Sequence, residues 1–189
     1  VGAGWWAVRT DPEQPPPEPG RERPPASPSG REAGTQPGAE PPSAAVERAL
    51  LQARLLFSRR GMGDLDRAHG LLEQAVLEAP GNADLHGWLA ISLATRANYF
   101  GNAAEALASA EEEATQALAL DPESAVAQAA AGLVALNRHL DWDRAVEHQR
   151  RAIELDPRLL PARQYLAEAY SAQGDHVKAI ATIDDALGR

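Results

Sequence analysis

The chain has 189 residues, a formal net charge of −9 at pH 7 and no cysteine. Disulfide bonds and cysteine-ligated metals are therefore excluded, and the negative charge disfavours direct binding of nucleic acid by this chain. No run of about 20 apolar residues occurs, so no segment of the chain is expected to span a bilayer unaided.

The first eight residues, VGAGWWAV, are small or apolar and include the adjacent tryptophans Trp5 and Trp6. Tryptophan suits the membrane interface, where its ring contacts apolar chains and its N–H finds a polar partner. We interpret residues 1–8 as the end of a membrane helix whose larger part lies upstream of Val1. The alternative is a frayed terminus in which the two tryptophans adjoin by chance.

Residues 9–42 form a proline-rich stretch, since eleven of the fifteen prolines lie in residues 1–42. With almost no aliphatic side chains after Val8, this stretch cannot bury enough apolar surface to offset the entropy of ordering its backbone. We predict a disordered linker, partly in the polyproline II conformation. Residues 1–42 contain four basic and six acidic side chains, a net charge of −2, so the rest of the chain carries −7 of the total of −9. A spacer that is not basic is consistent with the non-cytoplasmic side of a membrane.

Residues 43–189 are rich in Ala, Leu and Glu, which predicts helix throughout. Three stretches, LLEQAVLEAP, ATQALALDP and RRAIELDP, end in the same way at Pro80, Pro122 and Pro157. Recurrence at this interval is typical of a helical array in which each unit buries its apolar face against its neighbours. We predict four units, at about residues 43–80, 81–122, 123–157 and 158–189.

The first unit is expected to begin at Ser43, the predicted N-cap of a helix over residues 44–60 whose register is ambiguous. Gly63 and Asp64 are expected to precede its second helix. One face of this second helix holds small and apolar residues: Ala68, Leu72 and Ala75.

The second unit is about eight residues longer, with the surplus around RANYFGNAAEAL. Asn102 followed by Glu105 resembles a capping box at the start of its second helix. Trp88 lies inside an apolar helix and is predicted to belong to the core. Two helix faces are expected to pack together: Leu89, Ala90 and Leu93 against Ala110, Ala114 and Ala117.

The third unit repeats this scheme, and its turn, HLDWD, is one residue longer. Trp142 opens its second helix, either as a staple of the turn onto a neighbouring helix or as an exposed anchor. The expected pairing is of Ala131, Gly132 and Ala135 with Ala145, Gln149 and Ala152.

In the fourth unit, Gly174 is expected to adopt the left-handed conformation of a turn and Asp175 to cap the next helix. The two facing helix surfaces are predicted to hold Leu166, Ala167 and Tyr170 on one side and Ala179, Ile183 and Ala186 on the other.

The fourth unit resembles the tetratricopeptide repeat, a helix-turn-helix unit of about 34 residues. The matching positions are Leu166, Ala167, Tyr170, Gly174, Ala179, Ile183 and Ala186. The third unit departs from the signature at Gln149, where a large apolar residue is usual, and the second carries the insertion. The resemblance covers about residues 44–189 and implies an all-α solenoid of about four such units.

A narrower resemblance is to the C-terminal repeats of ToxR/CadC-like transcriptional regulators. The matching pieces are Tyr99, Glu105 to Leu107, Ala117 to Pro122, Asp141 to Asp143 and Arg150 to Pro157. This resemblance implies an array in the periplasm, anchored in the inner membrane and joined to a cytoplasmic winged helix that this chain lacks. The repeats also resemble those fused to some bacterial adenylate cyclases and serine/threonine kinases. The upstream domain therefore stays open, and a cytoplasmic location is the alternative.

Catalytic chemistry needs convergent groups, and the sequence does not bring them together. It contains no H-E-x-x-H motif, no G-x-S-x-G motif and no P-loop. We therefore predict no enzyme, no cofactor and no metal site. The histidines near the DWD turn raise the hypothesis of a proton switch, with solvated surface histidines as the alternative. The five histidines are scattered over the units: His69, His86, His139, His148 and His176.

The resemblance implies that the first helices of the units line a concave groove that binds a protein or peptide. The centre of this groove is expected to be apolar and its rim polar or acidic, which suits a helix or extended segment with apolar anchors. It lacks the lysine-and-asparagine clamp of chaperone-tail-binding repeats. The alternative is that some of these positions pack against a neighbouring unit. The expected groove residues are Asp84, Gly87, Ile91, Thr95, Val126, Ala129, Leu133, Leu136, Asn137, Gln164, Glu168 and Ser171.

Together these patterns predict a non-enzymatic interaction or sensory domain, the periplasmic part of a membrane-anchored transcriptional regulator. A partner protein or a second copy of the chain in the groove would change the spacing of the DNA-binding domains. The rival hypotheses are an envelope assembly scaffold and the regulatory extension of a bacterial adenylate cyclase or serine/threonine kinase.

Overall fold

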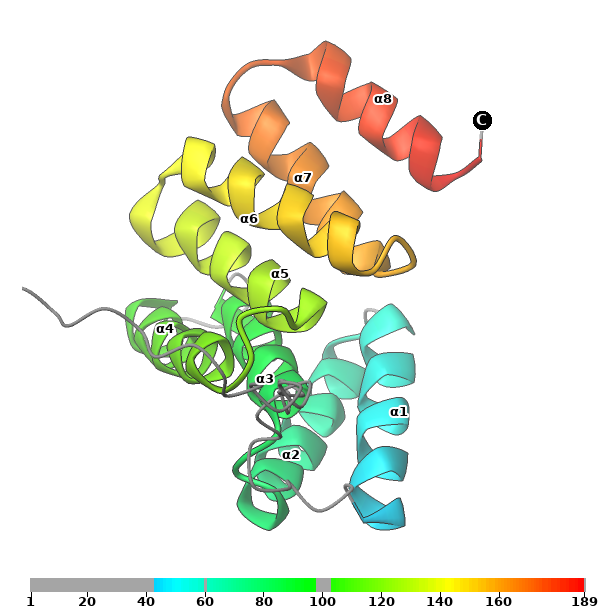
Figure 1. Ribbon diagram of the computed structural model, residues 1–189, viewed down its shortest axis with the longest axis vertical. Coiled ribbons are helices and arrows are strands. Elements are labelled where there is room, and N and C mark those ends of the chain that lie inside the picture. Colours follow the sequence, from blue (N-terminus) through cyan, green and yellow to red (C-terminus); the bar gives the residue numbers. More distant parts are fainter. Residues whose placement is uncertain (1–42, 60, 98–102, 189) are drawn as a thin grey trace, which may run out of the picture. The chain divides into compact units, whose positions relative to one another are not determined.

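The computed structural model describes residues 43–59, 61–97 and 103–188, and within them the regular structure is entirely helical (Figure 1). The all-α prediction is therefore confirmed. In chain order the elements are α1 (Ala44–Arg59), α2 (Met62–Glu78), α3 (Ala83–Ala97), α4 (Ala103–Leu120), α5 (Ala125–Val134), the π-helix η1 (Ala135–His139), α6 (Trp142–Leu155), α7 (Leu160–Ala172) and α8 (His176–Ala186).

Consecutive helices pack as four hairpins: α1 with α2, α3 with α4, α5 with α6 and α7 with α8. Each hairpin stacks on the next. In this stacking α2 contacts α3, both α3 and α4 contact α5, and α6 contacts α7. The described helices lie in one compact unit within residues 39–189. None of them is both long and apolar enough to cross a membrane. The predicted membrane-helix end at residues 1–8 and the predicted linker at residues 9–42 lie outside the described residues.

Alanine brings the helices close together. The alanines expected between α3 and α4 are fully or almost fully buried: Ala90, Ala110, Ala114 and Ala117. Ala145 and Ala152 of α6 are also fully buried. Because a methyl group lets two helix axes come closer than a longer side chain does, these residues set the spacing within the α3–α4 and α5–α6 hairpins. Trp88 is 4% exposed, as predicted for a core residue.

The last helix departs from this scheme. None of the residues of α8 is buried, and Ile183, expected to face α7, is 39% exposed. The face of α8 that carries Ile183 is therefore only partly covered. The reason is that the described chain covers α8 mainly from one side, that of α7.

Two predicted helix caps are confirmed by their hydrogen bonds and one predicted turn glycine by its backbone angle. The Ser43 Oγ accepts from the Val46 N–H at 3.3 Å, and the Asp175 Oδ1 accepts from the Lys178 N–H at 3.1 Å. Gly174 has φ 83°, the left-handed conformation that glycine adopts without strain. Gly63, by contrast, lies in the first turn of α2 rather than before it. The predicted capping pair begins at Asn102, outside the described residues.

The extra residue of the HLDWD turn is absorbed by a change of helix type. After α5 the chain widens into η1, and Leu140 follows in the left-handed region at φ 53°. The Asp141 N–H then returns to the Ala135 carbonyl at 3.0 Å, and the Asp141 side chain caps α6. A π turn closes with an i to i+5 hydrogen bond and so contains one residue more than an α turn. Trp142, which follows, is 41% exposed, and its role as a staple of the turn or as an exposed anchor stays a prediction.

The departure at Gln149 is matched by a glycine on the facing helix. Gln149 is fully buried, and its Nε2 donates to the Ala129 carbonyl at 2.9 Å. Gly132 leaves the space for this amide, because a β-carbon at position 132 would overlap the Gln149 side chain. The α5–α6 hairpin therefore accepts a polar residue where the repeat signature has a large apolar one.

Candidate protein-binding groove

An apolar groove of about 680 Å³ lies where α1, α7 and α8 approach one another, with α3 beneath. In Figure 1, α1 and α8 lie on the right of the picture and α7 lies beside α8. Its volume falls in the range of well-formed ligand sites. The groove is lined by Leu51, Arg54, Leu55, Phe57, Ser58, Trp88, Arg158, Leu159, Leu160, Pro161, Gln164, Ile183, Ala186 and Leu187.

Exposed apolar side chains form two walls of the groove. Leu51 and Leu55 of α1 are 63% and 56% exposed, and being four residues apart they share one helix face. Ile183 and Leu187 repeat this spacing at the end of α8. Leu160, at the start of α7, is 65% exposed. Large apolar residues gathered on one surface mark an interaction site far more often than apolar residues scattered singly.

The floor of the groove is aromatic and well packed. The Phe57 and Trp88 rings meet edge to face, with their centroids 5.9 Å apart and an interplanar angle of 67°. The Arg54 guanidinium lies 5.6 Å from the centroid of the Trp88 ring, within the range of a cation–π interaction. Because Phe57 and Trp88 are both buried, the floor is formed before any ligand arrives.

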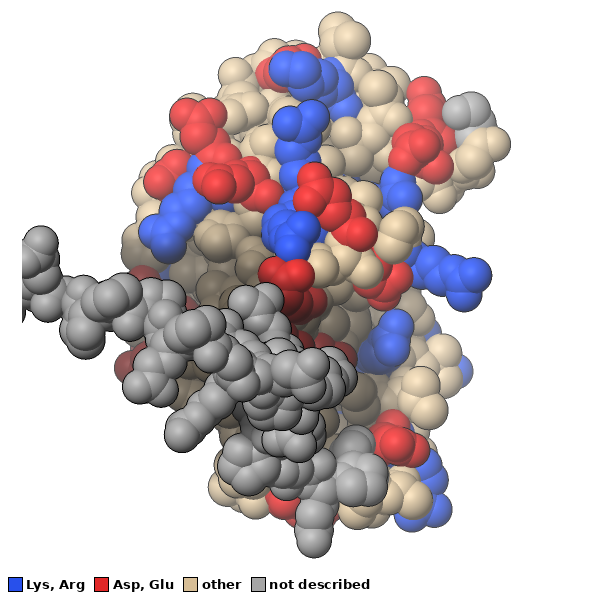
Figure 2. Space-filling view, viewed as in Figure 1, with Lys and Arg blue, Asp and Glu red and all other residues tan. Residues whose placement is uncertain are grey.

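The charged groups that line the groove are both cationic. Arg54 comes from α1 and Arg158 from the turn between α6 and α7, and the lining contains no Asp or Glu. Gln164 adds a polar group whose Nε2 donates to the Glu168 Oε1 at 2.7 Å. Elsewhere charges of both signs are interleaved, as Figure 2 shows over the exposed face of α6. The groove is therefore a positive region of an acidic chain.

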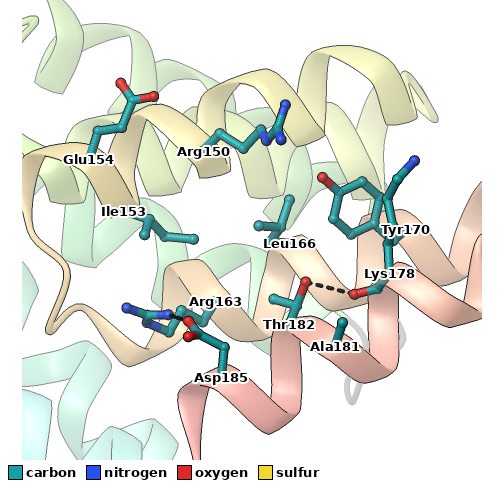
Figure 3. A pocket seen from close by; sticks show the side chains of 10 residues that line it. All are labelled: Arg150, Ile153, Glu154, Arg163, Leu166, Tyr170, Lys178, Ala181, Thr182 and Asp185. Carbon is teal, nitrogen blue, oxygen red and sulfur yellow. Dashed lines mark hydrogen bonds and ion pairs between the residues drawn. The ribbon is translucent and has the colours of Figure 1, made fainter. Parts of the chain in front are cut away.

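A second cavity, of about 660 Å³, lies among α6, α7 and α8 and is more open (Figure 3). Its polar groups are largely paired within the protein. Arg163 forms an ion pair with Asp185, and Lys178 pairs with Asp175 at 2.7 Å while its Nζ lies 5.4 Å from the Tyr170 ring centroid. Because these side chains already have partners, we take the first groove as the candidate site.

The structure divides the twelve residues expected in the groove by their burial. Gln164 lines the groove described above. Glu168 and Ser171 are exposed, and Asp84, Thr95 and Asn137 are half-buried. The Asp84 Oδ1 accepts from the Ser124 Oγ at 2.7 Å. The buried members are Gly87, Ile91, Val126, Ala129, Leu133 and Leu136.

Packing of α3 on α5 accounts for the burial. Gly87 touches α5 so closely that a β-carbon there would lie 2.9 Å from the Val126 Cγ1. Ile91 and Ala129 are fully buried in the same core. Without a rearrangement of the helices, a partner cannot reach these side chains.

Leu51, Leu55 and Leu187 form walls of the groove and were not among the residues expected there from the sequence. A signal was present, because α1 carries apolar residues on two faces. One face, with Val46, Ala53 and Phe57, enters the core, and the other faces the groove. This double pattern is what made the register of the first helix ambiguous.

Three of the five histidines, His69, His86 and His148, lie at least half-buried between helices, whereas His139 and His176 are exposed. His86 is buried, with its Nδ1 2.6 Å from the Glu113 Oε2 and its Nε2 2.9 Å from the Pro80 carbonyl. Burial lowers the pKa of His148, with a smaller lowering from Arg144 that Glu147 opposes. Burial is also the main cause of the lowered pKa of His69. Within the described ranges, no group of three or more His, Asp or Glu side chains is placed to hold a metal ion.

No protein-family model matches the chain, and no curated protein matches it. Several solved structures, however, are similar to the chain. A tetratricopeptide-repeat protein of Thermus thermophilus, TTC0263, superposes with a TM-score of 0.57 at 20% identity, over 76% of this chain and 73% of that one. An O-GlcNAc transferase of Thermobaculum terrenum superposes with a TM-score of 0.51 at 21% identity, over 70% of this chain and 23% of that one. The described part of this chain therefore has the tetratricopeptide-repeat fold.

Proposed function

We propose that the chain is a non-enzymatic interaction module whose groove between α1, α7 and α8 holds a segment of a partner protein. The observation that supports this most strongly is the gathering of exposed apolar side chains, Leu51, Leu55 and Leu160 among them, around a preformed aromatic floor. Covering these side chains would release water from apolar surface at about 25 cal/mol per Å². Repeat folds use such surfaces to dock helices and extended segments.

A display library of peptides, selected against the full chain, tests this proposal. Leu55→Glu and Leu160→Glu place a charge in the groove and should weaken the selected peptides at least about tenfold. Leu77→Glu is the matched control, because Leu77 is 83% exposed and lies outside the groove. Peptides that bind all three variants as well as the parent chain, or no selected peptide at all, would contradict the proposal.

We further propose that this module is the periplasmic sensing part of a membrane-anchored transcriptional regulator. Support comes from the sequence alone: a tryptophan-ended apolar segment at residues 1–8, a proline-rich stretch at residues 9–42, and the helical array after them. The enlarged second unit and the DWD turn add to it. Occupancy of the groove, by a partner or by a second copy of the chain, would change the spacing of the anchored chains.

The coding sequence upstream of Val1 tests this second proposal. A winged-helix domain followed by one apolar span would support it. A kinase or cyclase domain there would contradict it, and so would a reporter fused after residue 42 that is active in the cytoplasm only. The first proposal does not depend on this result.

A further inference from the structure

The charge of the groove narrows the chemistry of its partner. Residues 43–189 carry a net charge of −7, yet the charged groups of the groove are Arg54 and Arg158. Within the described residues, neither guanidinium has an acidic partner. Arg138 and Arg151, outside the groove, are each paired with a glutamate.

The two arginines lie beside the apolar walls. Arg54 stands on α1 between Leu51 and Leu55, with its guanidinium over the Trp88 ring. Arg158 lies in the turn that leads to Leu160 and α7. An apolar surface flanked by unpaired cations is complementary to an apolar surface flanked by carboxylates.

The spacing of the walls indicates the form of the partner. On α1 the exposed Leu51 and Leu55 stand four residues apart, and so do Ile183 of α8 and Leu187, the C-cap that follows α8. A guest helix with apolar residues at i, i+3 or i+4, and i+7 presents side chains at the matching interval.

We propose that the groove receives an acidic amphipathic helix of a partner protein, whose apolar face meets the leucines and whose carboxylates pair with Arg54 and Arg158. This proposal rests on the proposed function of the groove and specifies its ligand. A fatty acid would bring a single carboxylate, whereas the groove offers two guanidinium groups from separate elements.

Two synthetic peptides of about 15 residues test the proposal. Both carry leucines at i, i+3, i+4 and i+7, and the remaining positions are glutamate in one and lysine in the other. Their binding to the full chain is followed by fluorescence anisotropy at physiological ionic strength. We expect the glutamate peptide to bind at least about tenfold more tightly than the lysine peptide.

Charge reversal then assigns the preference to the groove. The variant with Arg54→Glu and Arg158→Glu should bind the lysine peptide more tightly than the glutamate peptide. The matched control carries Arg144→Glu and Arg150→Glu, the same change of net charge at exposed arginines outside the groove, and should keep the preference of the parent chain. Because Arg54 stacks on Trp88, replacing it could destabilise the fold, so the thermal unfolding of each variant is measured first. If the double variant is unfolded, Arg158→Glu alone is used in its place.

Several outcomes would overturn the proposal. They are a preference of the parent chain for the lysine peptide, equal loss in both double variants, and tighter binding of oleate than of the glutamate peptide. If neutral library peptides are lost with Leu55→Glu while neither charged peptide binds, this inference fails and the proposed function stands. If no peptide of any kind binds the groove, both fail.

Discussion

The amide group of Gln149 occupies the space that a β-carbon at position 132 would need. Gln149 is held there by its hydrogen bond to the Ala129 carbonyl, and its Oε1 has no hydrogen-bond partner among the described residues. Gln149 departs from the repeat signature, which has a large apolar residue at this position, and Gly132 on the facing helix compensates by leaving room for the amide.

Gly132→Ala is therefore expected to lower the free energy of unfolding by about 1–3 kcal/mol, because the added methyl displaces the buried amide and breaks its hydrogen bond. Urea unfolding measures this change. Gly70→Ala in α2 is the control: nothing lies within 4 Å of its β-carbon position, so stability should rise by about 0.5–1 kcal/mol. In a Gln149→Ala background the loss from Gly132→Ala should shrink, and a full loss there would refute the steric explanation.

Leu140→Gly is expected to stabilise the protein by about 0.5–1 kcal/mol. Leu140 is 67% exposed and held at φ 53°, where a side chain is strained and glycine is not. The exposed Leu77 lies in α2, so Leu77→Gly should destabilise by about the same amount. Melting temperatures of the two variants measure the effect, and shifts of the same sign would argue against a strained turn.

Acidification should destabilise the fold through His148 and His69. Burial lowers the pKa of both side chains from 6.5, so below that pH the unfolded chain binds protons that the folded chain does not. Their stabilisation is present above pH 6.5 and is lost as the pH falls toward the lowered folded values. Unfolding at pH 7.5 and at pH 5.5 should show a smaller pH dependence in His148→Gln than in the parent chain. If His148→Gln shows the same pH dependence of stability as the parent chain, that dependence comes from other groups.

Hydrogen exchange should be fastest in α8 and slowest in α3. Buried residues are plentiful in α3, whereas α8 has none. Local opening costs least where few apolar contacts are lost. Asp175→Ala removes the N-cap of α8. This change should lower the free energy of local opening of α8 by about 1 kcal/mol and so speed its hydrogen exchange further. Uniform protection of both helices would contradict this view of the array end.

The helices and most of their ends were predictable because they depend on local signals. Prolines stop the helices, Ser43 and Asp175 cap them, and alanines recur where helices cross. The HLDWD insertion was visible as an extra residue. Its π geometry was not, because the choice between a loop and a widened turn depends on the packing of the flanking helices.

The groove was harder to predict, since periodicity gives the face of a helix but not what covers that face. Ile91 and Leu133 have the pattern of groove residues, yet the close approach of Gly87 to Val126 brings α3 onto α5 and buries them. Leu51 and Leu187 line one surface although they are far apart in the sequence. Their approach depends on the stacking of every hairpin between them.

Binding in the groove can be followed residue by residue in methyl NMR spectra of the full chain titrated with the glutamate peptide. We expect the groove signals to shift together while those of Leu77 and Val177 stay in place; the groove signals are those of Leu51, Leu55, Leu160, Ile183 and Leu187. Saturable shifts at Leu77 or Val177, with the groove methyl groups unmoved, would contradict it.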